Sequence, residues 1–353
     1  MRPLAPERRK VIVDPSFRSM DDILSAHEAE RLAGLVEIVW GRDEPMPLED
    51  FTASLPDAFA VVSSGWRYGD VLDDAPNLRA ILTVSGGWPP ELDYARCFER
   101  GIRVLSAAPA FAEAVAEMAL ALAFASSREL VAEDRLVRTR HERWLSSADT
   151  LRTFLLTGKR VGFVGFGNIG RRLRGLIEPF GCELCAYDPW LTDAFLRDEE
   201  VEPTSLRRLM ETSRVIFVLA TPTNENRALL SRELLGLVQP DAVLVLVSRA
   251  HVVDFDALTE FVLEGRFRAA IDVFPSEPLE PDHPIRTAAG AVLSPHRAGL
   301  MQEALWEIGR RVVDDLEALV NGLPPRRLQV GEPELATRYV RTTQVVARPW
   351  GPA

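Results

Sequence analysis

The stretch KRVGFVGFGNIG, residues 159–170, decides the fold of this chain. An apolar run of strand length leads into the spacing G-x-G-x-x-G, where a helix begins. Glycines are needed because the turn is tight and its backbone must approach a ligand closely, while the first N–H groups of the helix suit a pyrophosphate. In this context the motif predicts a dinucleotide site. The turn residues expected to bind it are Gly165, Gly167, Asn168, Ile169 and Gly170.

An acidic residue follows at the distance that such a site requires. Asp188 stands eighteen residues after Gly170, at the end of the next apolar run. Its carboxylate suits the hydroxyls of an adenosine ribose and would repel a 2′-phosphate. The next residues, Pro189 and Trp190, supply no compensating cation. The sequence therefore favours NAD over NADP as the cofactor.

The chain from residue 159 onward alternates short Val/Ile/Phe-rich runs with longer amphipathic segments, which is typical of a parallel sheet covered by helices on both faces. We expect strands at 161–166, 183–188, 214–220, 242–247, 269–274 and 291–295. We expect helices at 168–180, 204–212, 231–238 and 254–264. This pattern predicts a doubly wound α/β domain.

A second, smaller alternation precedes it. We expect strands at 10–14, 36–40, 58–62, 78–84 and 102–106, and helices near 21–33 and 91–100. The helical pattern at 302–321 ends at Gly322 and two prolines and cannot form a domain alone. We expect it to return to the N-terminal alternation.

Composition narrows the classes of function. A length of 353 residues with 47% hydrophobic and 26% charged residues predicts two globular domains. The net charge of −11 argues against nucleic acid or an anionic membrane as a partner, because both need a basic face. The apolar stretch 111–124 is interrupted by Glu113 and Glu117 and is shorter than the roughly 20 residues of a membrane span, which predicts a buried helix.

Cysteine usage and the N-terminus predict a cytoplasmic protein. The start of the chain shows no long apolar segment with a cleavage site. The chain has only three cysteines, and this small, odd number does not suggest a disulfide framework. Cys182 and Cys185 resemble half of a zinc site, but no second pair exists, so we expect no metal.

Three polar side chains stand at the expected carboxyl ends of strands, where α/β sheets bind ligands. His296 is suited to acid–base work, and Glu277 could hold its imidazole in one tautomer and favour the protonated form. Arg249 offers a fork of donors that matches a carboxylate. Each residue alone is commonplace, but the combination suits hydride transfer at a hydroxyl or keto carbon beside a carboxylate.

The sequence resembles the D-isomer-specific 2-hydroxyacid dehydrogenase family over residues 55–325. The likeness lies in LTGKRVGFVGFGNIG, YDP, TPTNENRALLS, SRAHVVD, AAIDVFPSEPL and SPHRAG, in this order. It implies Arg249, Glu277 and His296 as the catalytic trio and Asp272 as the partner of the nicotinamide carboxamide. It further implies contacts of the cofactor with Thr221 and Pro222. The expected activity is NAD-dependent hydride transfer at C2 of a small 2-hydroxy or 2-keto acid of D configuration.

The resemblance also implies the architecture. A Rossmann cofactor domain at 108–298 is expected to be inserted into a flavodoxin-like substrate domain formed by 1–107 and 299–330. Residues 331–353, rich in Pro, Arg and Thr with little periodicity, are expected to form a peripheral tail. The helical region that starts at Val115–Glu117 usually builds a homodimer in such proteins.

Two segments depart from the family pattern. The substrate loop usually reads GxGVD, but here residues 85–90 read SGGWPP, so we expect Gly86, Gly87 and Trp88 to shape an altered substrate site. The usual glycine after the catalytic arginine is Ala250, followed by His251, for which an exposed loop position is expected. These differences affect the identity of the substrate more than the reaction.

Two other functions compete with this interpretation. A non-catalytic, NAD-responsive scaffold is possible because a relative of the family is a transcriptional corepressor, although a scaffold has no need of a matched base and its partner. Formate- or phosphite-type enzymes share the fold, but formate enzymes normally carry Gln where Glu277 stands.

Overall fold

The computed structural model describes residues 8–142, 144 and 152–336. The chain divides into two compact units. The N-terminal unit contains the chain up to residue 111 and from 301 onward, and the inserted unit contains 112–300. Residues 337–353 of the expected tail lie outside the described residues.

The inserted unit is built on a parallel sheet in the order β12-β11-β10-β9-β6-β7-β8. Its strands are β6 (Arg160–Val164), β7 (Glu183–Tyr187), β8 (Glu202–Pro203), β9 (Val215–Val218), β10 (Val243–Leu246), β11 (Arg268–Ile271) and β12 (Ala291–Leu293). The chain order reverses at β6, because β7 lies on one side of it and β9 on the other. Such a switch point opens a crevice at the carboxyl ends of the strands.

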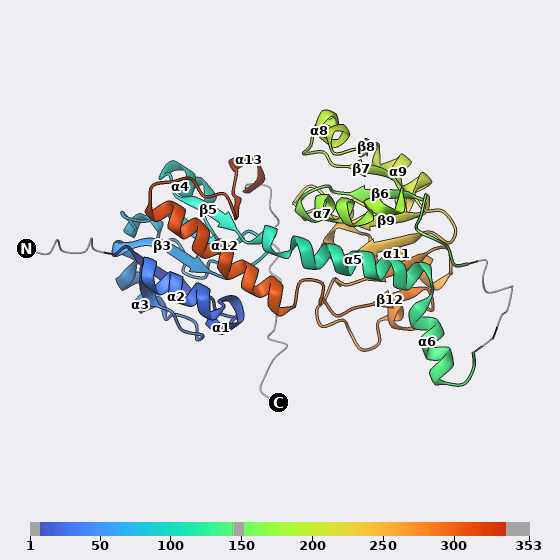
Figure 1. Cartoon of the computed structure of the whole chain (residues 1–353), viewed down its shortest axis with the longest axis horizontal. Coiled ribbons are helices and arrows are strands. Elements are labelled where there is room, and N and C mark those ends of the chain that lie inside the picture. The colour runs from blue at the N-terminus through green and yellow to red at the C-terminus, as the bar shows by residue number, and fades with distance from the viewer. Residues whose placement is uncertain (1–7, 143, 145–151, 337–353) are drawn as a thin grey trace, which may run out of the picture. The chain divides into compact units, whose positions relative to one another are not determined.

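Helices cover both faces of this sheet, as the hydrophobic runs on its strands require. One face shares a single apolar core with α9 (Leu206–Thr212), α10 (Arg232–Leu235) and α11 (Phe255–Leu263). On the other face α5 (Ala112–Ser127) lies beside α7 (Asn168–Ile177), as Figure 1 shows. The short α8 (Asp193–Asp198) connects β7 to β8. The expected doubly wound arrangement is confirmed.

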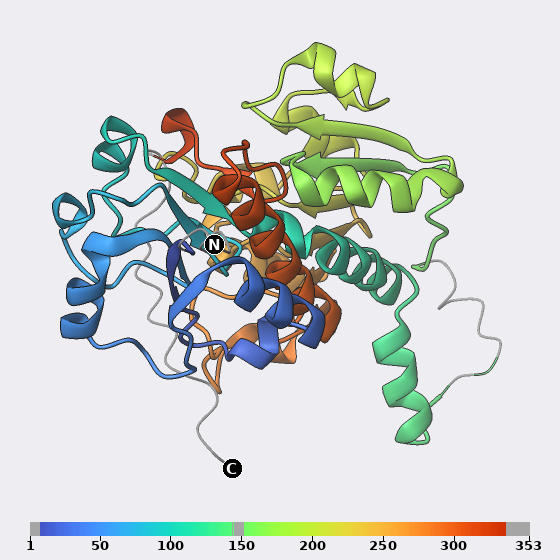
Figure 2. The same ribbon diagram turned by 60° about the vertical axis from the view of Figure 1, so that its left-hand side comes forward.

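The helices α5 and α6 (Leu130–Arg138) differ in burial, because eight of the sixteen residues of α5 are buried and none of α6 is. The helical stretch Ala108–Ser127 is long and apolar enough to cross a membrane by length and composition, and 39% of its apolar window is buried. The expectation of a shorter, buried helix is therefore met only in part. The helix α6 extends away from the rest of its unit (Figures 1 and 2).

The N-terminal unit has a second sheet, in the order β13-β5-β4-β3-β1-β2. Five parallel strands follow the flavodoxin-like order 2-1-3-4-5, and β13 joins antiparallel to β5. The strands are β1 (Lys10–Asp14), β2 (Glu37–Trp40), β3 (Ala58–Ser63), β4 (Ala80–Thr83), β5 (Arg103–Ser106) and β13 (Gln329–Val330). The expected flavodoxin-like sheet is confirmed, and the short strands β8 and β13 are additions that the sequence pattern missed.

Alternating side chains of these strands point to two separate cores. One core is shared with α1 (Met20–Ile23), α2 (Ala26–Leu35) and α12 (Gln302–Val320), and the other with α3 (Leu48–Ser54) and α4 (Tyr94–Glu99). The helix expected at 21–33 is two helices, because Ser25 caps a new one by accepting the N–H of Glu28. The short α13 (Pro333–Ala336) ends the described chain.

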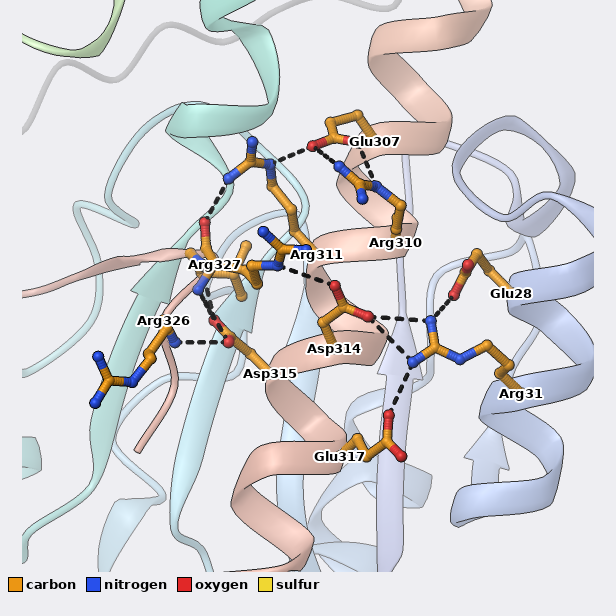
Figure 3. A network of polar contacts seen from close by, with 11 residues as sticks. Glu28, Arg31, Glu307, Arg310, Arg311, Asp314, Asp315, Glu317, Arg326 and Arg327 are labelled. Carbon is orange, nitrogen blue, oxygen red and sulfur yellow. Dashed lines mark hydrogen bonds and ion pairs between the residues drawn. The ribbon is translucent and has the colours of Figure 1, made fainter. Parts of the chain in front are cut away.

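A polar network fixes the returning C-terminal segment to this unit (Figure 3). Arg31 of α2 donates to Asp314 and Glu317 of α12. Asp315, only 1% exposed, accepts the successive backbone N–H groups of residues 326–328. The buried carboxylate thereby satisfies the N–H groups of the segment that leads into β13.

Candidate active site

The glycine-rich turn between β6 and α7 has the geometry that its sequence predicts. Gly165 has φ +89°, and a Cβ there would lie 2.7 Å from the backbone of Ala220. A Cβ on Gly170 would meet the Phe166 ring at 3.1 Å, whereas one on Gly167 would face open space. The first two close approaches explain why the turn needs glycines. The open side at Gly167, the N-cap of α7, leaves room for a ligand at the helix N-terminus.

Asp188 stands next to this turn, just past the carboxyl end of β7. Its Oδ2 accepts the N–H of Phe166 at 2.8 Å, and its Oδ1 accepts the N–H of Trp190 at 2.9 Å. The carboxylate is half-buried, and each oxygen keeps a further lone pair for a hydroxyl donor. The residue therefore ties the turn to β7 while remaining able to bind a ribose.

The loop after β9 carries Thr221 and Pro222 and borders the same turn through Ala220. Asn226 holds this loop, because its side chain accepts the N–H of Thr223 at 2.7 Å and donates to the carbonyl of Thr221 at 2.8 Å. His251 is half-buried, and its Nε2 lies 3.0 Å from the carbonyl oxygen of Thr223. The exposed position expected for His251 is therefore wrong.

Glu277 and His296 form the hydrogen-bonded pair that the sequence predicts. Glu277 Oε2 lies 2.6 Å from His296 Nδ1, and Oε1 accepts the N–H of Phe274 at 3.0 Å. Since an ionised carboxylate only accepts, the Nδ1 proton points at Glu277, and Nε2 is left for another partner. The side chain of His296 is 38% exposed, so this nitrogen is accessible.

Electrostatics keep Glu277 ionised. Burial opposes its charge, but the hydrogen bonds from His296 and the Phe274 N–H, with the nearby Arg249, outweigh burial and hold the pKa of Glu277 below its ordinary value. Arg249 donates to the carbonyl of Ser248 at 2.7 Å. No carboxylate of the described chain forms an ion pair with it. Its charge is therefore available to an anionic ligand.

Asp272 organises the loop that carries His296. This fully buried carboxylate accepts the Ser294 hydroxyl at 2.5 Å and the N–H groups of Arg297 and Ala298 at 2.9 and 3.0 Å. The loop needs this support, because His296 has φ +52°, which costs a non-glycine residue about 1 kcal/mol or more. Asp272 thus positions His296 and keeps one lone pair for a further donor.

The predicted substrate loop belongs to the N-terminal unit. Gly86 is exposed, and a Cβ there would lie 3.2 Å from the Phe111 ring. The carbonyl oxygen of Gly87 accepts the Ser106 hydroxyl at 3.1 Å. Trp88 is 6% exposed within the apolar core, and a Cβ on Gly331 would approach its ring to 3.0 Å. Its role in substrate binding stays a prediction, and its burial favours packing.

These observations define a class of protein: a two-unit oxidoreductase with a dinucleotide turn at a sheet switch point and an acid–base pair beside a free arginine. The model of one protein family, described as D-isomer specific 2-hydroxyacid dehydrogenase, NAD binding domain, matches residues 120–298 of this chain. The chain belongs to this family of soluble enzymes. It is an oxidoreductase that acts on 2-hydroxy and 2-keto acids.

Individual relatives agree with this assignment. A glyoxylate reductase of Thermofilum pendens is 32% identical over 261 residues, which cover 72% of this chain and 76% of the relative. A D-3-phosphoglycerate dehydrogenase of Mycobacterium tuberculosis is 32% identical over 88% of this chain and 58% of its own length. The crystal structure of a phosphoglycerate oxidoreductase from Rhizobium etli superposes with a TM-score of 0.81 at 35% identity, covering 92% of this chain and 99% of that one.

Sequence reasoning missed several supporting residues. Asn226 and Ser294 lie within the segments that resemble the family, but the sequence predicts no role for them. The partners of Asn226 are backbone groups, and the partner of Ser294 is a carboxylate distant in sequence. Asn226 sits three residues after the Thr223 N–H that it accepts, a spacing at which short polar side chains commonly bond to their own backbone. In the described ranges no three His, Cys, Asp or Glu side chains gather as a metal site.

Proposed function

We propose that this enzyme reduces a small 2-keto acid to the D-2-hydroxy acid with NADH. His296 donates the proton, and Arg249 binds the substrate carboxylate. Glu277 orients the imidazole of His296 and favours its protonated form. The observation that carries the proposal is the 2.6 Å contact between Glu277 Oε2 and His296 Nδ1, which leaves Nε2 as the proton donor. The same pair argues against a non-catalytic scaffold, which has no use for an aligned acid.

The reaction assigns one task to each side chain. The nicotinamide, when bound, supplies a hydride to the keto carbon. His296 Nε2 gives its proton to the keto oxygen, which becomes the hydroxyl, and the imidazole ends neutral. Glu277 stays ionised throughout and stabilises the imidazolium before transfer. Arg249 can take the carboxylate bidentately and fix the face of the keto group that the hydride meets.

For the cofactor we propose NAD rather than NADP. The turn residues Gly165–Gly170 would hold the pyrophosphate, and Asp188 would accept the ribose hydroxyls. A 2′-phosphate there would meet a carboxylate already held in place by two backbone N–H groups. Asp272 would accept the carboxamide with its remaining lone pair, and Thr221 and Pro222 would line the nicotinamide side.

On the substrate side we propose that the backbone of the exposed Gly86 and the half-buried Gly87 contributes N–H donors to the carboxylate. The family's loop is altered here by Trp88, whose burial in the apolar core would fix the shape of the loop. The residues 1–107 and 299–330 would then act as the substrate domain and 108–298 as the cofactor domain.

We further propose a homodimer in the cytoplasm. The apolar side chains of Leu130, Val131 and Val137 on α6 are each more than half exposed. A second copy of the chain would cover these side chains. Light scattering coupled to size exclusion would give twice the mass of 39.3 kDa, and a monomeric mass at micromolar concentration would contradict the dimer.

The function is tested by NADH oxidation with glyoxylate and larger 2-keto acids, followed by chiral analysis of the product. We expect a D product and a higher kcat/KM with NADH than with NADPH. His296→Ala should lower kcat by about 10²–10⁴, the range of general acid–base catalysis. An unchanged rate in His296→Ala, or an L product, would refute the proposal.

A further inference from the structure

Two loops of the inserted unit follow the neighbouring parallel strands β9 and β10. The cofactor loop, residues 219–230, carries Thr221 and Pro222, and the arginine loop, residues 247–254, carries Arg249. Loops at the carboxyl ends of adjacent parallel strands lie side by side. Main-chain hydrogen bonds of 2.9, 3.0 and 3.0 Å join these two loops, from the N–H of Ala228 to the carbonyl of His251, from Leu230 to Val252 and from Asp254 to Leu230. Each loop therefore helps to hold the other in position.

The His251 side chain joins the same loops at a second point. Its Nε2 lies 3.0 Å from the carbonyl oxygen of Thr223. Because a carbonyl only accepts, Nε2 carries the proton and donates it. The Thr223 N–H in turn donates to Asn226 Oδ1, and Asn226 Nδ2 donates to the carbonyl of Thr221. A chain of hydrogen bonds thus runs from His251 to Thr221.

The cofactor loop needs such contacts because its backbone is strained. Ala228 has φ +49°, a left-handed conformation that is unfavourable for a residue with a Cβ. A strained turn of this kind persists only where surrounding contacts determine it. The bond from the Ala228 N–H to the His251 carbonyl is one of these contacts, and it uses the backbone of His251. Replacement of the His251 side chain should therefore leave the turn in place and loosen the loop only near Thr223.

Arg249 depends on the same segment. His251 lies two residues after it, within the short 3₁₀-helix η6 (Ala250–Val252). Arg249 is the N-cap of this helix, and its carbonyl accepts the Val252 N–H at 3.4 Å. The Arg249 guanidinium donates to the carbonyl of Ser248 at 2.7 Å, a contact within its own loop. The direction of the guanidinium therefore follows the position of the arginine loop, which His251 ties to the cofactor loop.

We propose that His251 couples cofactor binding to substrate binding. When Thr221 and Pro222 contact bound NADH, the cofactor loop loses conformational freedom, and the hydrogen bond from His251 extends this restriction to the arginine loop. The substrate carboxylate then meets a guanidinium that is already restricted, so the substrate binds more tightly to the enzyme with NADH than without it. The inference rests on the proposed function, which assigns the nicotinamide to the cofactor loop and the substrate carboxylate to Arg249. His251 is a positioning residue and takes no part in proton transfer.

The test measures one quantity, the coupling factor. This factor is the Kd of oxamate for the cofactor-free enzyme divided by its Kd for the enzyme saturated with NADH. Oxamate is the probe because it has the carboxylate and the neighbouring carbonyl of a 2-keto acid but accepts no hydride. Titration calorimetry on the full chain gives both constants. We expect a coupling factor of about 5 or more for the native enzyme, as is typical of two coupled sites.

Two variants and one control isolate the hydrogen bond. His251→Leu keeps the bulk of the side chain without a donor and should lower the coupling factor by about 2- to 10-fold, the effect of one neutral hydrogen bond. His251→Gln restores an N–H donor and should keep most of the coupling. Ser231→Ala is the control for lost stability, because the Ser231 hydroxyl caps α10 by accepting the Leu234 N–H and lies outside the hydrogen bonds that lead to Thr221. It should lower the melting temperature and leave the coupling factor unchanged.

A native coupling factor of about 1, a native factor retained in His251→Leu, or an equal loss in His251→Gln or in Ser231→Ala would overturn the proposal. The same proteins separate it from the proposed function. If the native enzyme reduces glyoxylate but His251→Leu keeps the native coupling factor, the reaction stands and the coupling fails. If the native enzyme oxidises no NADH with any 2-keto acid, while His251→Leu still lowers the coupling of oxamate to NADH, the proposed reaction fails and the coupling stands.

Discussion

Replacing Glu277 with Gln removes one charge at the centre of the site and nearly preserves its shape. Glu277 Oε1 accepts the Phe274 N–H and Oε2 accepts His296 Nδ1. A glutamine has only one acceptor oxygen, so its NH₂ group must face one of these two donors. If the glutamine oxygen keeps the hydrogen bond from the Phe274 N–H, its NH₂ group faces His296 Nδ1. The variant then favours the neutral imidazole that carries no proton on Nδ1.

The magnitude follows from the kind of hydrogen bond that is lost. A bond to a charged group contributes about 1.5–3 kcal/mol and a neutral one about 0.5–1.5 kcal/mol, so the protonated imidazole loses roughly 1 kcal/mol of stabilisation. Both side chains are partly exposed, at 38% and 22%, and solvent screening keeps the loss at this lower end. Since 1.36 kcal/mol corresponds to one pH unit, the pH midpoint should move by somewhat less than one unit.

The direction is fixed by the role of His296. Reduction needs the protonated imidazole, so activity falls as the pH rises. Losing the carboxylate disfavours the protonated form, so in Glu277→Gln this fall should begin at lower pH. Glu277 itself stays ionised across the range, because its pKa is held below the ordinary value.

The assay is kcat/KM for reduction between pH 5 and pH 9, at fixed ionic strength. Glu280→Gln is the control, because this exposed glutamate lies three residues further along the same loop. It should leave the profile in place. A Glu277→Gln profile with the native midpoint would refute the assigned pairing, even if His296→Ala abolished activity.

Three further predictions concern the cofactor turn and the stability of the units. Asp188→Ser should narrow the preference for NADH over NADPH in kcat/KM, and equal preference in the native enzyme would contradict the role of Asp188. Gly165→Ala should destabilise the protein and weaken NADH binding, because its Cβ would lie 2.7 Å from the backbone after β9, whereas Gly175→Ala on the exposed side of α7 should be tolerated. Asp315→Asn should lower the free energy of unfolding by about 2 kcal/mol in denaturant titrations, because an NH₂ group would face backbone N–H donors. The exposed Asp70→Asn should change it little, and an equal effect of both would refute the stabilising role of the Asp315 hydrogen bonds to residues 326–328.

The sequence predicted the elements whose hydrophobic pattern is long and regular. The apolar runs of the strands and the amphipathic patterns of the helices in both units are typical of a doubly wound α/β fold, so the fold class could be predicted from them. The strands β8 and β13 have two residues each, too few for any pattern. The break between α1 and α2 depends on a cap at Ser25 inside an otherwise helical pattern.

The candidate site could be predicted where chemistry alone names the residue. Glu277 and His296 could be predicted as a pair because acid–base catalysis needs both, and the structure places them within hydrogen-bond distance. Supporting contacts escaped prediction, because they join backbone groups to side chains far away in sequence. Asp272, for example, holds Arg297 and Ala298 across 25 and 26 residues. The burial of Trp88 likewise depends on Gly331, more than two hundred residues away.

The discontinuous N-terminal unit has a consequence for how the chain folds during synthesis. The inserted unit is contiguous from 112 to 300, so it can fold as soon as its last strand has left the ribosome. The N-terminal unit has to wait, because α12 completes one of its cores and β13 covers the edge of β5. Until residue 330 is made, the nascent chain exposes an apolar sheet face and an unpaired strand edge. We expect ribosome-bound chains from which residues up to 300 have emerged, but 301–330 have not, to resist protease in the inserted unit and to be cleaved in the first hundred residues.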